Sequence, residues 1–335
     1  MPSGDNPAMD IVTHAALGAS LAAALAPSHQ RRLAAGIGLL ASLLPDADAL
    51  IQSGSDPLLV LDYHRHFTHA LIFIPVGALI AALLLWPMLR HRMVFSRLYL
   101  YSVLGYGQGG VMDACTSYGT HLLWPFSESK LAWNLISVFD PVFTLLLLVP
   151  LILTLRRPGV ARVHLGLALA SGYLCLGYLQ QQRVTENMLT VIARRGHTPD
   201  HLTVKPTLGN QLLWRSLYRH DGRIQVDATH AGWALRHYAG QRAPLFESLE
   251  PADSRRSADI ERFRRFSDGW LVETAPGYVG DARYAMLPTT IAPIWGITWA
   301  DNGQLQFVSQ HEMTPASRRQ WLRMLAGRDL SDLPQ

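Results

Sequence analysis

Charged residues are scarce in this chain of 335 residues, because Asp, Glu, Lys and Arg together make up only 16% of it. Soluble domains ordinarily contain about 25% charged residues. Lysine occurs only as Lys130 and Lys205, and no lysine-rich stripe alternates with aromatic residues. The net charge of +4 therefore does not indicate a nucleic-acid partner. The hydrophobic share of 49% excludes a disordered or fibrous protein.

Cysteine is equally rare, with Cys115 and Cys175 as the two examples. Their spacing excludes a cysteine-based zinc finger and a disulfide framework. Both lie in apolar stretches, so we expect buried free thiols.

The charge that is present is distributed unevenly. The first 182 residues contain 10 Lys or Arg and 9 Asp or Glu, whereas the shorter remainder contains 19 and 16. This difference predicts a membrane-embedded domain over residues 1–182 and a soluble domain over residues 183–335, which is the size of one domain.

Long apolar runs fill the first part of the chain, at residues 11–27, 33–44, 70–89, 98–112, 138–155 and 163–181. Three of them reach the roughly 18 to 20 residues that cross a bilayer as a helix. The run 33–44 is short and ends at Pro45, so the first two runs form either two spans or a hairpin that dips into the membrane. We expect a polytopic α-helical membrane domain with about five or six membrane-embedded helices.

The connections between these runs alternate in charge. Three of them are rich in arginine: Arg31 and Arg32; Arg90, Arg92 and Arg97; Arg156, Arg157 and Arg162. Short basic connections stay in the cytoplasm. The other connections, together with the N-terminus and the C-terminal domain, are therefore predicted to lie on the outer, periplasmic face of a bacterial inner membrane.

Histidine and aspartate residues collect at the ends of the runs that this topology places at the outer face. They are His14, Asp46, Asp48, His64, Arg65, His66, His69, Asp113, His121 and Asp140. Acids and histidines at a membrane are costly unless they are paired or bind an ion. Imidazole and carboxylate ligands together suit zinc, manganese or iron, so we expect one or two divalent ions here, most of all zinc.

Local spacing suggests how some of these residues meet. If a helix begins near Phe67, His66 and His69 share one face. Asp46 and Asp48 converge if the chain after Pro45 is an extended turn. One of them is then expected to be a metal ligand, and the other to orient a ligand or act as general base.

Three residues have structural alternatives. His14 is a ligand or an interfacial helix cap. Arg65 either binds phosphate or extends to lipid headgroups. Asp140, which precedes a proline, is a catalytic group or a helix N-cap.

The sequences DIVTHAALG, LLPDAD, YHRHFTHALIF, DACTSYGTHLLWPFS and ISVFDPVFTL occur in this order within residues 10–155. As a set they resemble the YdjM-like inner-membrane metal-dependent hydrolases, also known as the domain of unknown function 457 family. NQLLWRSLYRHDGRI and GDARYAML are similar to the domain that follows the membrane part in some relatives.

The resemblance implies metal ligands at His14, Asp46, His64, His69 and Asp113, with Asp48, Arg65 and Asp140 in supporting positions. Many relatives have a histidine four residues before the motif aspartate, where this chain has Gly109 within GYGQGG. The site is then mononuclear, or His121 replaces the missing ligand.

The C-terminal domain is expected to be α+β. Alternating or aromatic runs predict strands at 214–218, 224–227, 294–299 and 304–308, with turns at HDGR and ADNG. Helices are predicted at 257–266 and 315–326, the second capped by Thr314. Asp281 and Arg283 are expected to form a structural ion pair.

These features predict an enzyme, a membrane-bound metal-dependent hydrolase of a lipid or lipid-linked ester or phosphoester. In this mechanism Asp48 or His66 transfers protons and Arg65 stabilises developing negative charge. One alternative is an ion-coupled transporter, which GYGQGG would favour by interrupting a helix. Another is a metal-free scaffold. The sequence indicates no particular protein partner.

Overall fold

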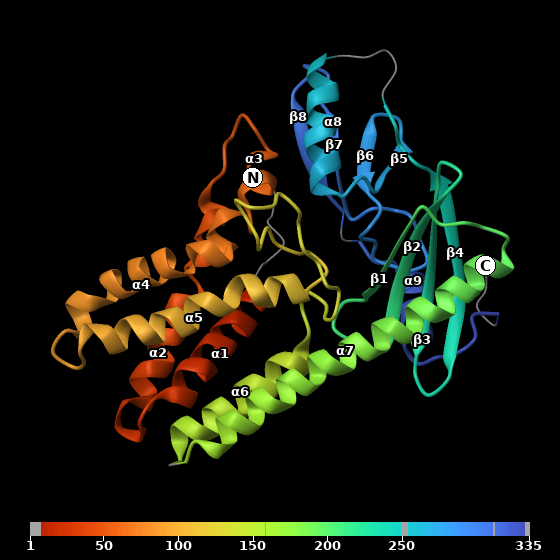
Figure 1. Cartoon of the computed structure of the whole chain (residues 1–335). Coiled ribbons are helices and arrows are strands. Elements are labelled where there is room, and N and C mark those ends of the chain that lie inside the picture. Colours follow the sequence, from red (N-terminus) through yellow and green to blue (C-terminus); the bar gives the residue numbers. More distant parts are fainter. Residues whose placement is uncertain (1–7, 158, 249–253, 311, 332–335) are drawn as a thin grey trace. The chain divides into compact units, whose positions relative to one another are not determined.

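The structure is a computed structural model that describes residues 8–157, 159–248, 254–310 and 312–331. The chain divides into two compact units (Figure 1). The first contains the described residues up to Ile51, then Tyr63–Tyr178 and Leu208–Asn210. The second contains Gln52–Asp62, Leu179–Thr207 and the described residues from Gln211 onward.

The first unit is helical. Its elements are α1 (Ala8–Leu25), η1 (Ser28–Gln30), α2 (Arg31–Ser42), η2 (Pro45–Leu50), η3 (Phe67–His69), η4 (Leu71–Phe73), α4 (Ile74–Leu89), α5 (Phe95–Cys115) and α6 (Pro141–Arg156). Two further helices are shared with the second unit: α3 (Leu59–Tyr63), of which Tyr63 alone belongs to the first unit, and α7 (Ala161–Arg194). All of α7 up to Tyr178 belongs to the first unit.

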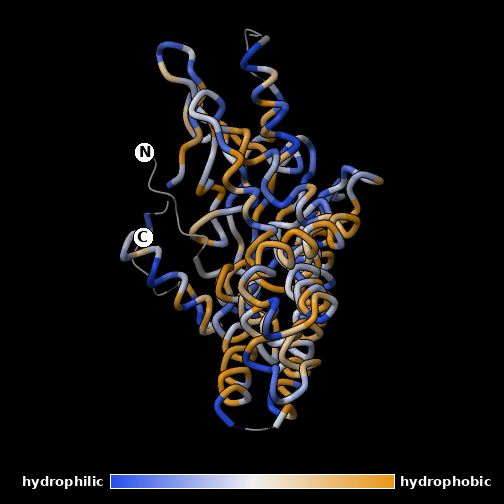
Figure 2. Tube along the Cα trace, turned by 90° about the vertical axis from the view of Figure 1, so that its left-hand side faces the viewer, coloured by the Kyte–Doolittle hydropathy of each residue, from blue (hydrophilic) through white to orange (hydrophobic). Residues whose placement is uncertain are grey.

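Three segments are long and apolar enough to cross a membrane: Ser28–Leu50, Leu71–Leu89 and Ala161–Arg194. Ile11–Leu25 and Pro141–Arg156 are shorter apolar helices, so the count of five or six embedded helices stays a prediction. Large apolar side chains on α4, α6 and α7, such as Leu84, Leu145 and Leu165, are more than half exposed. Figure 2 shows many hydrophobic residues in the helical part of the chain. Apolar side chains that no protein covers are typical of a lipid-facing surface.

Small residues allow the helices to approach closely. A Cβ atom on Gly38 of α2 would lie 2.3 Å from the carbonyl oxygen of Gly18 on α1, and one on Gly105 of α5 would lie 2.3 Å from that of Gly38. Close backbone contact of this kind is common between membrane helices. The expectation that GYGQGG interrupts a helix is wrong, because α5 is continuous from Phe95 to Cys115.

The three arginine-rich connections meet at one end of the helices. Arg97 donates to the Gln30 side chain, and Arg32 Nε donates to the carbonyl oxygen of Leu155, each at 3.0 Å. Figure 1 shows the α1–α2, α4–α5 and α6–α7 connections on the same side of the first unit. The start of α1, the end of α5 and the start of α4 lie at the other end, where the predicted site residues are found.

The second unit is an antiparallel α+β domain, as the sequence predicts. Its two four-stranded sheets both follow the chain order, β1-β2-β3-β4 and β5-β6-β7-β8. The elements are β1 (His201–Pro206), β2 (Leu213–His220), β3 (Arg223–Ala231), β4 (Leu235–Pro244), α8 (Ser254–Phe266), β5 (Leu271–Ala275), β6 (Tyr278–Asp281), β7 (Trp295–Trp299), β8 (Leu305–Ser309) and α9 (Pro315–Leu325).

The core of this unit lies between helices and sheets. Val184, Met188 and Ile192 of α7 pack on Trp214 and Tyr218 of the first sheet.

The HDGR turn joins β2 to β3 with Asp221 and Gly222 both at positive φ, the conformation of a tight hairpin turn. Thr314 caps α9 by accepting the Ser317 amide, and Asp281 pairs with Arg283 at 2.7 Å, so both expectations are confirmed.

One short segment of the N-terminal half belongs to the second unit. Arg262 of α8 donates to both carboxylate oxygens of Asp56, at 3.1 and 3.0 Å, and also donates to Asp62.

Cys115 is buried as expected, whereas Cys175 is exposed, because it lies on an apolar helix face that no other part of the described chain covers.

Candidate metal centre

His69 is the centre of a buried polar cluster at the end of the first unit opposite the arginine-rich connections. Its Nε2 lies 3.0 Å from Asp113 Oδ2 and 3.4 Å from Asp46 Oδ1, and its Nδ1 lies 3.2 Å from Asp48 Oδ2. Asp46 and Asp48 come from η2, His69 from η3 and Asp113 from the last turn of α5. We call Asp46, His69 and Asp113 the inner group, since their ligand atoms all lie within 4.8 Å of one another.

Three nearby carboxylates determine the pKa of His69. Burial alone lowers the pKa of this imidazole, but interactions with Asp113, Asp46 and Asp48 outweigh burial and raise it to about 10. The cluster therefore favours a positive charge at this position, supplied by a proton or by a cation.

Asp48 fixes the loop that carries His69. One carboxylate oxygen accepts the Arg65 amide at 2.9 Å and the Thr68 hydroxyl at 2.5 Å, and the other lies 2.9 Å from His64 Nδ1. Because both oxygens are engaged, Asp48 orients its neighbours. It holds His64 in the manner of a carboxylate that orients a metal-binding or catalytic histidine.

The backbone around His69 is tightly constrained. Arg65 has φ +59°, a conformation that is unusual for a residue with a side chain, and such strain is concentrated at functional sites. Gly110 of α5 contacts the His69 carbonyl so closely that an added Cβ atom would lie 2.0 Å from its oxygen. Only glycine permits this approach of α5 to η3.

Asp113 joins four of the predicted residues. Its Oδ1 lies 3.1 Å from both His14 Nε2 and Arg65 Nη1, and its Oδ2 lies 3.0 Å from His69 Nε2. One carboxylate oxygen of Asp113 also lies within 4.8 Å of one of Asp46. His14 is 1% exposed inside α1, so it is not an interfacial cap. Arg65 is 4% exposed, so it does not extend to lipid headgroups.

The inner group has the chemistry of a metal site. Asp113 Oδ2 is buried, and His69 Nε2 faces it at 3.0 Å. A buried carboxylate is costly unless a donor or a cation compensates its charge. A divalent ion held by one imidazole and two carboxylates would satisfy it, and this donor set fits zinc, manganese or iron.

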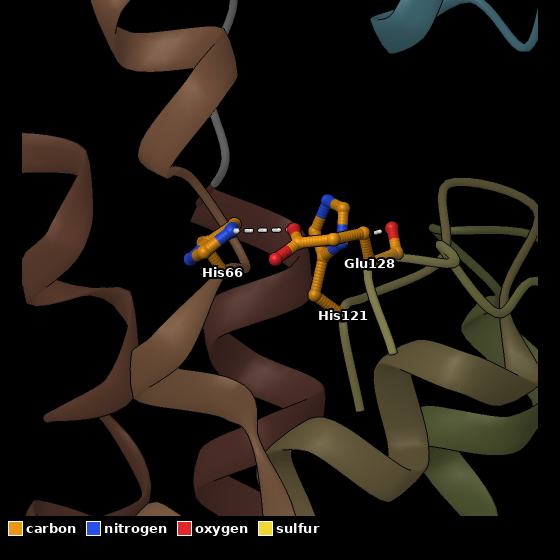
Figure 3. Close-up of side chains that lie close together, drawn as sticks. All are labelled: His66, His121 and Glu128. Atoms are coloured by element: carbon orange, nitrogen blue, oxygen red, sulfur yellow. Dashed lines mark hydrogen bonds and ion pairs between the residues drawn. The ribbon is translucent and has the colours of Figure 1, made fainter. Parts of the chain in front are cut away.

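A second group lies beside the first and contains His66, His121 and Glu128 (Figure 3). The centroids of the two imidazole rings are 4.7 Å apart, and His66 Nε2 lies 3.9 Å from Glu128 Oε2. Burial, together with His66 and Lys130, lowers the pKa of His121 to about 4. His121 is thus neutral across the physiological range, which is the protonation state that binds metals.

The structure differs from two local expectations. His66 and His69 do not share a face, because η3 begins at Phe67 and the backbone at His66 is not helical. The chain after Pro45 is a 3-10 helix instead of an extended turn. Asp46 and Asp48 still converge, since they approach the two different nitrogens of the His69 ring.

Two other predicted site residues have different surroundings. Asp140 caps α6, with one oxygen accepting the Phe143 amide at 3.0 Å and the other accepting the Tyr173 hydroxyl at 2.9 Å. This is the N-cap alternative. His121 belongs to the group with His66, so it does not replace a histidine at Gly109, which instead packs against Pro45.

Sequence reasoning missed Glu128 and Thr68. Glu128 is one of few acidic residues in the first half and lies seven positions after His121, a signal that could have indicated it. Thr68 gave no signal, because its role depends on the position of Asp48.

The apolar helices and the buried histidine–aspartate cluster define the chain as a helical membrane protein with a candidate metal centre. The family model described as YdjM inner membrane protein matches residues 9–184, and the chain belongs to this family. This membership supports a location in the inner membrane.

The chain is also similar to the "Uncharacterized protein YfhP" of Bacillus subtilis (strain 168). The two are 23% identical over 248 residues, which are 70% of this chain and 71% of that protein. No solved structure gave a significant match.

Proposed function

We propose that the protein is a metal-dependent hydrolase of a lipid or lipid-linked ester or phosphoester at the outer face of the inner membrane. The observation that carries the proposal is the convergence of Asp46, His69 and Asp113, from three separate elements, on one point where His69 and Asp113 are buried and Asp46 is partly exposed. Buried carboxylates and histidines at a membrane are functional residues in most cases, because their burial is costly.

The inner group would hold the ion, which is zinc or alternatively manganese or iron. When bound, such an ion supplies Lewis acidity and lowers the pKa of a coordinated water. The three ligand atoms can hold one ion, so the proposal does not require a second ion in the inner group. His14 would set the position of Asp113, and Asp48 would orient the His69 ring through its Nδ1.

His64 is the residue we assign to proton transfer. Its Nδ1 faces Asp48 at 2.9 Å, so the other ring nitrogen is the one that accepts and releases a proton. The side chain is 23% exposed, whereas those of His14 and His69 are each 1% exposed. The contact with Asp48 favours His64 over His66, which is 18% exposed but lies in the second group.

Arg65 would stabilise the negative charge that develops on the substrate. Its guanidinium lies 3.1 Å from Asp113 and 4.9 Å from the centre of the Tyr118 ring, so a positive charge is held at the cluster. A fixed charge in a buried site stabilises a transition state more effectively than one in water.

The surroundings of the cluster favour an amphiphilic substrate. Leu50, Leu123, Phe126 and Trp133 lie on the connections around the site and are strongly exposed, with Phe126 82% exposed. Aromatic and apolar side chains of this kind are typical of the interface between lipid and water. The arginine-rich connections at the opposite end support an outer, periplasmic location for the site and for the C-terminal domain.

The test is the metal content of the detergent-purified chain by elemental mass spectrometry, with Asp46→Asn and His69→Ala beside the wild type. We expect stoichiometric zinc, manganese or iron in the wild type and its loss in both variants, while circular dichroism shows that the fold survives. Hydrolysis of phospholipid and lipid-linked phosphate vesicles is then measured. A wild type without metal, even when metal is offered during purification, would contradict the proposal and favour the transporter or the scaffold.

A further inference from the structure

His66, His121 and Glu128 are drawn together by two loops that hydrogen bonds hold side by side. The Arg65 carbonyl accepts both the His121 amide at 3.1 Å and the Thr120 hydroxyl at 2.9 Å. Farther along, the Leu71 amide donates to the Leu122 carbonyl at 3.0 Å. These bonds fix the register of the two loops, so the histidine rings are neighbours before any ligand arrives.

Glu128 is brought back to the histidines by a second constraint. Thr120 and Leu131 exchange two backbone hydrogen bonds, at 3.0 and 2.8 Å, and so close the loop between them. Within this loop the Glu128 carbonyl faces His121 Nδ1 at 3.0 Å. Figure 3 shows its carboxylate directed toward His66, with the His121 ring beside it.

We infer that His66, His121 and Glu128 form a second metal site, separate from the inner group, that binds an exchangeable first-row transition ion such as zinc. Two imidazoles and one carboxylate are the ligand set of many zinc sites, and imidazole also suits copper and nickel. This inference does not rest on the proposed hydrolase activity.

The ring of His121 is oriented as a metal ligand requires. His121 Nδ1 donates to the Glu128 carbonyl, which leaves Nε2 with a lone pair. Histidines that bind metals commonly donate their second N–H to a carbonyl or carboxylate in this way. His66 Nδ1 is buried without a hydrogen bond among the residues that are described, and His66 Nε2 is too far from Glu128 for one.

The distances need only a small adjustment. The three ligand atoms lie within 4.8 Å of one another, whereas ligands of a tetrahedral zinc ion are about 3 to 3.5 Å apart. The Glu128 side chain is 78% exposed, so it can rotate toward the histidines at little cost. Trp124 and Tyr63 border the His66 ring, with centroids 5.6 and 6.2 Å away, and limit its movement.

The two groups differ in burial, which predicts different exchange rates. The inner group contains the fully buried Asp113, whereas Glu128 opens the second group to solvent. An ion at the second group would leave quickly in a chelator, while one at the inner group would leave slowly. An ion at the second group would also link the loop before α4 to the loop after α5.

The experiment uses the full chain in detergent, with any purification tag of histidines removed. The protein is treated briefly with chelator and titrated with Co²⁺, whose visible absorption reports coordination by nitrogen and oxygen. Zn²⁺ is then added in competition. We expect the wild type to bind Co²⁺ at one rapidly exchanging site, and His121→Gln and Glu128→Gln each to weaken this binding at least about tenfold.

Two controls separate this site from the inner group and from adventitious binding. His29→Ala removes an exposed histidine elsewhere and should leave the titration unchanged, and Asp46→Asn should remove slowly exchanging metal while the Co²⁺ spectrum persists. Equal Co²⁺ affinity and stoichiometry in the wild type, His121→Gln and Glu128→Gln would overturn the inference. Loss of hydrolysis, or its absence, has no bearing on this outcome.

Discussion

His69 Nε2 faces Asp113 Oδ2 at 3.0 Å, and this pair joins the loop before α4 to the last turn of α5. Both side chains are almost completely buried. The contact therefore lies between two of the candidate metal ligands and beside the Arg65 charge. We expect changes at either residue to affect both stability and metal binding.

Asp113→Asn should release the inner metal and destabilise the protein. The change removes the carboxylate that faces Arg65, and loss of one partner of a buried ion pair costs about 3–5 kcal/mol. Elemental analysis and thermal unfolding in detergent measure the two effects. Asp62→Asn, which changes an acid paired with Arg262 outside the cluster, is the matched control, and an equal metal loss there would argue against a specific role for Asp113.

Arg65→Gln should reduce hydrolysis without removing the inner metal. Arg65 supplies charge to the cluster but is not a ligand, and loss of one stabilising group of this kind lowers kcat about 100- to 1,000-fold. Steady-state kinetics on the substrate found in the vesicle screen, together with metal content, test this. A variant that lost metal but kept the turnover of its loaded fraction would show that Arg65 is structural only.

Gly110→Ala should shift His69 and weaken metal binding. The new Cβ atom would overlap the His69 carbonyl oxygen at 2.0 Å, and overpacking of a tight contact costs about 1–3 kcal/mol. Gly36→Ala on α2 is the control, because no atom lies within 4 Å of its added Cβ. Similar unfolding temperatures and metal affinities in the two variants would contradict the importance of this contact.

Lys205→Met should stabilise the C-terminal domain and make its stability less dependent on pH. Burial, reinforced by Arg283 and Arg215, holds the pKa of the Lys205 amine well below its usual value. Its Nζ has no hydrogen-bond partner in the described part of the chain and lies 3.3 Å from the centre of the Tyr284 ring.

The sign of the effect follows from proton binding. The unfolded chain binds a proton at Lys205 up to a pH of about 10.4, whereas the folded chain releases it at lower pH, so wild-type stability rises with pH between these values. Thermal unfolding from pH 7 to 9 should show this rise in the wild type and a smaller one in Lys205→Met. The variant should gain about 1–3 kcal/mol at pH 7. A less stable variant with an unchanged slope would refute the prediction.

The predicted orientation can be tested by cysteine labelling. Ser55 lies in a connection predicted to be outside and His91 in one predicted to be inside, and both are exposed. In a Cys175→Ala background, an impermeant maleimide should label Ser55→Cys in intact spheroplasts and His91→Cys only after lysis. The reverse pattern would place the metal centre on the cytoplasmic face.

The apolar runs, the arginine-rich connections and the alternating strands could be read from the sequence because each depends on neighbouring residues. Hydrophobic length predicts a span, and a turn such as HDGR predicts a hairpin, without knowledge of distant contacts. The family motifs also indicated the histidines and aspartates of the inner group by type and order.

Only the tertiary structure shows which of those residues belong to the inner group and which to the second group. HRHFTH does not reveal that Arg65 adopts positive φ, so that His69 turns to Asp113 while His66 faces His121. Such a division depends on the packing of Gly110 against His69 and on the hydrogen bonds between two distant loops. The sequence by itself determined a membrane chain with a polar cluster at one end, and three-dimensional packing determined which side chains of that cluster lie together in each group.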